Sequence, residues 1–80
     1  MSCPRQFSEV TKRYLCCFYE ILDEMIDGMT KAELTDSISH NFIVQMIPHH
    51  EAAIEMSKNI LQYTTFIPLQ NIAQGIIEEQ

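Results

Sequence analysis

The sequence predicts an all-α fold, an antiparallel helical bundle of about three helices in a single domain of residues 1–80. Apolar residues recur every three or four positions in three separate segments, as expected for the buried face of a helix. No segment shows the strict alternation of apolar and polar residues that a half-buried strand requires. The connections between the segments are short, so consecutive helices are expected to be antiparallel neighbours.

The first helix is predicted over about residues 5–29. Its apolar face is continuous over this whole length, at spacings of three and four. Gly28 lies near the expected end, where a glycine can stop a helix or let it fray. Thr30 and Glu33 have the spacing of a capping box and could begin a short new turn.

The second helix is predicted over about residues 37–62, after the N-cap candidates of the segment TDSISHN. Pro48 falls inside it, where the missing N–H and the ring clash bend a helix or divide it. The apolar stripe stays in phase on both sides of Pro48, which favours one bent helix. Pro68 suits the first turn of a third helix, predicted over about residues 68–80.

Acidic residues outnumber basic ones by 11 to 5, which gives the chain a formal net charge of -6. This charge repels nucleic acid and anionic membranes, so neither is an expected partner. No apolar stretch reaches about 18 residues, and no signal-peptide pattern opens the sequence. We therefore expect a soluble, cytoplasmic protein.

The cysteines form an odd set, Cys3, Cys16 and Cys17, without the C-x-x-C spacing of zinc and redox motifs. This arrangement does not predict a disulfide scaffold. Cys16 and Cys17 are expected to be one buried and one partly exposed thiol, and either could serve as a soft metal ligand.

The segment MIPHHEAAIEM concentrates possible metal ligands in the second helix. At about 100° per residue, Met46, His49, His50, Ala53 and Met56 fall within an arc of about 120°. A thioether and an imidazole one turn apart could therefore bind one ion. Soft sulfur with borderline nitrogen suits Cu(I) and, less strictly, Cu(II) or Ag(I), whereas calcium and magnesium prefer oxygen ligands.

Two further methionines, Met25 and Met29, form an i,i+4 pair near the end of the first helix. Antiparallel packing would bring this pair toward the start of the second helix. A methionine stripe also fills irregular gaps in a core, so local physics leaves metal binding and simple packing both open. His40 points about a third of a turn away from Met46 and is expected at the surface.

Other chemistries have weaker support. Two adjacent histidines on one helix poorly supply the closed four-ligand shell of structural zinc, and the Glu-x-x-His pairs of di-iron bundles are absent from the sequence. The H-E-x-x-H protease signature is also absent, and Glu51 and Glu55 look like a solvated face. No nucleophile is paired with a base by spacing, so we do not expect an enzyme.

The run NFIVQMIPHHEAAIEMSKNIL resembles the signature of the domain of unknown function 305 family, which includes the CopM-like copper-binding proteins. The family pattern is Phe, then Met-Ile-Pro-His-His, then Ala-Ile-x-Met, and it is met here from Phe42 to Met56. The segments EMIDGM and LQNIAQGIIEEQ are similar to two further parts of the pattern. The family often has Asp-x-Asp where Ser39, His40 and Asn41 stand here.

This resemblance implies a ferritin-like helical bundle and the binding of copper or silver in bacterial metal tolerance. Carried over residue by residue, it implies six metal ligands: Met25, Met29, Met46, His49, His50 and Met56. The expected function is then a small, non-catalytic protein that sequesters copper, as Cu(I) or Cu(II), or passes it on.

Three helices with one apolar face each are not expected to close a core alone. A two-fold homodimer would let the helices of two chains complete a bundle. The alternative function is a structural or protein-interaction module without metal, in which the segment around Pro48 determines the fold. Zinc or iron binding is a third possibility.

Overall fold

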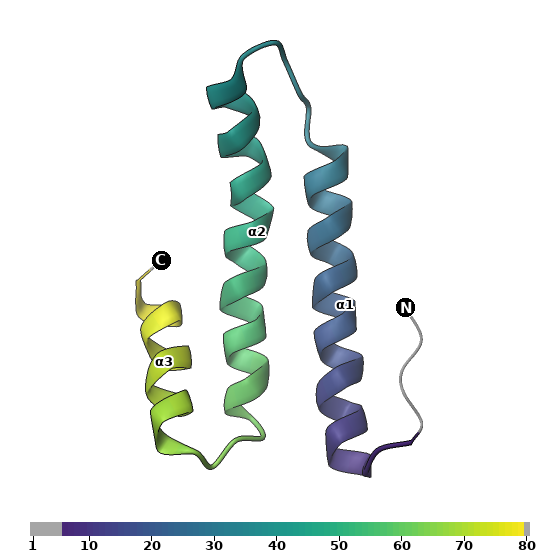
Figure 1. Cartoon of the computed structure of the whole chain (residues 1–80), viewed down its shortest axis with the longest axis vertical. Coiled ribbons are helices and arrows are strands. Elements are labelled where there is room, and N and C mark those ends of the chain that lie inside the picture. Colours follow the sequence, from purple (N-terminus) through teal and green to yellow (C-terminus); the bar gives the residue numbers. More distant parts are fainter. Residues whose placement is uncertain (1–5, 80) are drawn as a thin grey trace.

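The computed structural model describes residues 6–79, which form three helices: α1 (Glu9–Lys31), α2 (Ile38–Leu61) and α3 (Ile67–Glu78). The helices lie side by side with α2 in the middle (Figure 1). α1 packs against α2 and α2 packs against α3, whereas the backbones of α1 and α3 do not come close to each other. The prediction of an all-α chain with three helices is confirmed, since the described residues contain no strand.

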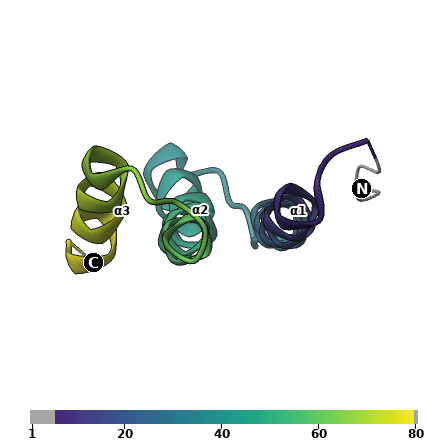
Figure 2. The same ribbon diagram turned by 90° about the horizontal axis from the view of Figure 1, so that it is seen from below.

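The three helices form a single flat layer. Its principal dimensions are 46 × 30 × 11 Å, and the view along the helices shows them in one row (Figure 2). Packed helix axes are about 8–10 Å apart, so the thinnest dimension has no room for a second layer. The radius of gyration is 15.0 Å, whereas a compact domain of this length has about 12 Å. One chain is therefore an open layer.

An open layer buries few side chains. Among the described residues, the buried apolar ones are Ala52, Ile54 and Ala73, and none of the large side chains is fully buried. Large apolar residues stay exposed on all three helices. None of the helices within residues 6–79 has both the length and the apolar character needed to cross a membrane.

Ser8 caps the N-terminus of α1, because its side chain accepts a hydrogen bond of 3.3 Å from the Thr11 N–H. Residues 6–8 are not helical, so α1 begins later than the predicted residue 5. At the other end, the Lys31 ammonium lies 2.8 Å from the Asp27 carboxylate. This hydrogen bond raises the pKa of Lys31 above its ordinary value.

Gly28 does not end α1, contrary to the sequence prediction. The helix continues to Lys31, and the Thr30 hydroxyl donates to the Ile26 carbonyl at 2.8 Å inside the last turn, so no new turn starts at Thr30. The glycine instead marks a close approach of two helices. A Cβ atom at Gly28 would lie only 2.9 Å from Cβ of Pro48 in α2.

Replacing Gly28 with alanine is expected to lower the free energy of unfolding by about 1–2 kcal/mol, because overpacking outweighs the better helix propensity of alanine. The matched control is Gly75→Ala in α3, where a new Cβ would meet no atom within 4 Å. That control should be neutral or stabilising by up to about 1 kcal/mol. Urea unfolding followed by circular dichroism measures both, and equal shifts of the two variants would contradict the close approach.

α2 is one continuous helix with Pro48 inside it, as predicted. Ser37 caps its start by accepting a hydrogen bond of 3.2 Å from the His40 N–H. The connection before it is tied to the helix by Asn41, whose side chain accepts from the Thr35 N–H and donates to the Thr35 carbonyl, both at 2.8 Å.

The contact between α1 and α2 includes a buried amide. Asn59 is 2% exposed, and its Nδ2 donates to the Tyr14 carbonyl of α1 at 3.1 Å. Its Oδ1 is buried without a hydrogen-bond partner among the described residues. The Tyr14 ring meets Tyr63 edge-on, with 6.0 Å between ring centroids. At this end of the layer, a hydrogen bond and an aromatic contact therefore join α1 to the end of α2 and the residues that follow it.

α3 is half as long as α2, with 12 residues against 24. At 1.5 Å per residue these lengths are about 18 Å and 36 Å. α3 lies beside the C-terminal half of α2 (Figure 1), where Leu69 and Ala73 share a groove with Ala53 and Ser57. The N-terminal half of α2 receives no cover from α3.

Candidate functional site

The N-terminal half of α2 carries a row of exposed, mostly apolar side chains, which we call the α2 strip. Its members recur at spacings of three and four along the helix: Ile38, Phe42, Ile43, Met46, Ile47 and His50. Further along α2, the residues that continue this spacing pack against α3. The strip is therefore a helix face that lacks a packing partner in one chain.

Met46 and His50 lie one helical turn apart on this strip. Both line a shallow pocket of about 430 Å³, together with Phe42, Ile47 and Glu51. Met46 is 37% exposed, and His50 is exposed as well. A thioether, an imidazole and a carboxylate thus border one solvent-facing hollow.

The other predicted ligands lie elsewhere. Met56 lines the groove between α2 and α3, and Met25 lines a small pocket between α1 and α2 beside Pro48. Pro48 and Met46 are about 200° apart around the helix, so Met25 faces a different side of α2. His49 is exposed on α2, and Met29 is half-buried near the end of α1.

The family model described as domain of unknown function (DUF305) matches residues 20–80, more than half of the chain. The chain belongs to the DUF305 family. No curated protein and no solved structure gives a significant match. The matched region of this DUF305 chain begins within α1 and includes the α2 strip and all six predicted ligands.

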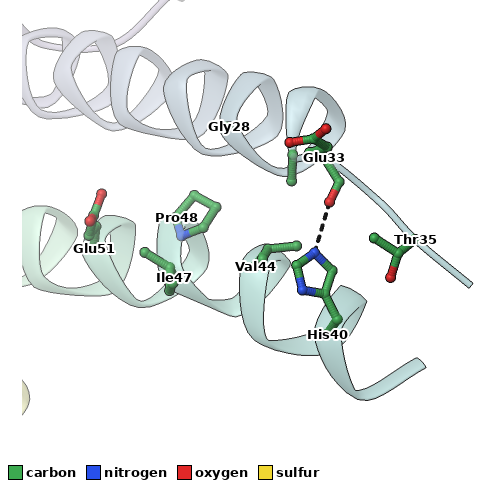
Figure 3. Close-up of a pocket in the computed structure, with 9 residues that line it drawn as sticks. Gly28, Glu33, Thr35, His40, Val44, Ile47, Pro48 and Glu51 are labelled. Carbon is green, nitrogen blue, oxygen red and sulfur yellow. Dashed lines mark hydrogen bonds between the residues drawn. The ribbon is translucent and has the colours of Figure 1, made fainter. Parts of the chain in front are cut away.

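A second pocket of the DUF305 chain, of about 620 Å³, lies between the end of α1 and the N-terminal half of α2 (Figure 3). No pattern in the sequence predicted this pocket. The His40 ring extends toward α1, and its Nε2 lies 3.1 Å from the Glu33 carbonyl oxygen (Figure 3). His40 is exposed at the surface, as predicted. Its ring is engaged by backbone and does not line the pocket of Met46 and His50.

Glu51 was assigned to a solvated face, yet it lines the pockets of both His40 and His50. It is exposed, so both descriptions hold. The signal in the sequence was its position directly after His50 and four residues after Ile47, which places it at the edge of the apolar stripe.

Within residues 6–79 of the DUF305 chain, no three His, Cys, Asp or Glu side chains lie close enough together to hold a metal ion. A site built on the described residues of one chain would therefore depend on a methionine sulfur.

Cys16 is disulfide-bonded, so the expectation of a free thiol there is wrong, whereas Cys17 is free and half-buried. Cys3 lies outside the described residues.

Proposed function

We propose that this DUF305 protein binds copper or silver without catalysing a reaction, and that it sequesters the ion or passes it on in bacterial metal tolerance. The observation that carries the proposal is the pocket on which Met46 and His50 open together. Thioether sulfur and imidazole nitrogen form a ligand pair that suits Cu(I) and Ag(I). The Glu51 carboxylate at the same pocket and the net charge of -6 both favour a cation.

The remaining predicted ligands take secondary places in this proposal. His49 is exposed and next to His50 in the sequence, but it does not line the pocket of Met46 and His50. Met25, Met29 and Met56 do not line the pocket of Met46 and His50, so their sulfur atoms would contribute only after a rearrangement of the helices.

The proposal includes a homodimer whose two layers stack into a closed, ferritin-like bundle. The chain exposes 5951 Å², whereas a compact monomer of its mass exposes about 5,000 Å². The excess of roughly 1,000 Å² is comparable to the 800 Å² or so that each partner buries in a stable interface. A second copy therefore accounts for the surface that one layer leaves open.

The rival function is a protein-interaction module without metal. It is favoured by the exposed apolar residues of the α2 strip, such as Phe42 and Ile47, which could receive an amphipathic helix of another protein. Both functions use the same surface, so only a binding measurement separates them.

A competition titration against a chromophoric Cu(I) chelator tests the metal function. We expect the wild type to take Cu(I) from the chelator, and the double variant Met46→Leu/His50→Ala to lose roughly tenfold or more in affinity. Uptake should also weaken in acid, because a protonated imidazole cannot bind a metal. The control is His40→Gln, which changes a histidine outside the pocket. Equally weak uptake by the wild type and the double variant would support the interaction module.

A further inference from the structure

We propose that one metal ion is shared by two copies of the chain, bound by Met46 and His50 of each copy at the two-fold axis of the dimer. The inference rests on the proposed copper function. It adds the location of the ion and the residues that complete its ligand shell.

One chain brings too few ligands to the pocket. Met46 and His50 are its soft and borderline donors. The sulfur atoms of Met25 and Met56 belong to residues that line other grooves, and the described residues contain no three-ligand cluster of His, Cys, Asp or Glu. An ion on Met46 and His50 alone would keep most of its coordination sphere open to water.

The surface around these two donors requires a partner. The α2 strip is apolar and exposed, and the chain itself does not cover it, because α3 is too short and α1 packs on the side of α2 that carries Pro48. A second copy presents a strip of the same length and the same apolar character. Contact between identical patches is what a two-fold interface requires.

A two-fold axis that passes between Met46 and His50 brings four donors together. In such a pairing Met46 of one chain lies level with His50 of the partner subunit, and the reverse holds by symmetry. Positions four apart are about 6 Å apart along a helix, so two sulfur and two nitrogen atoms surround the axis. Helices commonly cross at about 50°, and a crossing of this size leads the partner's α2 away from the strip before it reaches α3.

Charge links the ion to the assembly. Each chain carries a formal charge of -6, and Glu51 lies at the edge of the shared pocket. Two copies therefore repel each other, and the Glu51 carboxylates at the edges of the shared pocket add to this repulsion. A cation at the axis offsets this repulsion, so metal binding should strengthen dimerisation.

The test combines a titration with Ag(I), a probe that does not change oxidation state, with light scattering on the full chain. We expect half an equivalent of Ag(I) per chain at saturation and a dimer that resists dilution roughly tenfold better with Ag(I) than without it. X-ray absorption of the Cu(I) form should show two sulfur and two nitrogen neighbours.

The variant Met46→Leu keeps the strip apolar and removes the sulfur, so it should still fold while losing roughly tenfold or more of the Ag(I) affinity and the effect of Ag(I) on the dimer. His40→Gln should behave as the wild type does. One equivalent of Ag(I) bound tightly to a monomer would overturn the shared site and leave the proposed function intact. Absence of Cu(I) and Ag(I) binding in the wild type would overturn the proposed function itself.

Discussion

Replacing Ile43 with glutamate is expected to convert the proposed dimer into a monomer at micromolar concentration. Ile43 is 58% exposed in one chain and lies within the α2 strip, so the proposed dimer buries it. Burial of an unpaired carboxylate opposes association by about 3 kcal/mol or more, which weakens dimerisation roughly hundredfold. Light scattering on a sizing column measures the mass directly.

The chain offers a matched control for this change. Val10 is 56% exposed, nearly as much as Ile43, but it lies in the first turn of α1, far along the sequence from the strip. An acidic residue is tolerated in the first turn of a helix, so Val10→Glu should fold and remain a dimer. If Val10→Glu dissociates the dimer and Ile43→Glu does not, the interface lies on another face of the layer.

Replacing Asn59 with aspartate is expected to destabilise the chain by about 3 kcal/mol or more. The substitution removes the Nδ2 donor and places a carboxylate against the Tyr14 carbonyl, at a position that is 2% exposed. Two acceptors then face each other without a proton between them. The loss should shrink as the pH falls, because a protonated carboxyl can donate to the Tyr14 carbonyl.

Asn59→Leu separates the charge from the loss of the hydrogen bond. Leucine has the same branching at Cγ, although it is larger, and it also removes Oδ1, which is buried without a partner among the described residues. The Tyr14 carbonyl loses its side-chain donor while the unpaired Oδ1 is removed, so the expected loss is about 1 kcal/mol, well below that of the aspartate variant. Urea midpoints at one protein concentration compare both variants, and an equal loss in the two would mean that shape alone decides the effect.

The helices could be predicted from the sequence because their signals are local. The apolar period of three to four residues identified all three segments, and the continuous phase across Pro48 correctly predicted one helix. The i,i+4 spacing of Met46 and His50 predicted that they share a face, and they line one pocket. Such features depend only on positions within one helix.

Other features depend on contacts between helices, which cannot be read from positions within one helix. Gly28 was predicted to end the first helix. This prediction is wrong, because the role of the glycine is set by Pro48 in another helix. Met25 was predicted to lie toward the start of the second helix, whereas it lies beside Pro48 and Ala52, because its neighbours depend on which side of α2 faces α1. The sequence predicted that three helices would not close a core alone, but it did not predict a single row, because apolar periodicity does not show which sides of α2 receive α1 and α3.

The row of helices gives α2 a special place in unfolding. α1 and α3 each pack against α2, and their backbones do not come close to each other, so either could detach while the other remains docked. Local opening of this kind is seen as amide hydrogens that exchange at different rates. In a single chain, the amides in the C-terminal half of α2, which has neighbours on both sides, should exchange last.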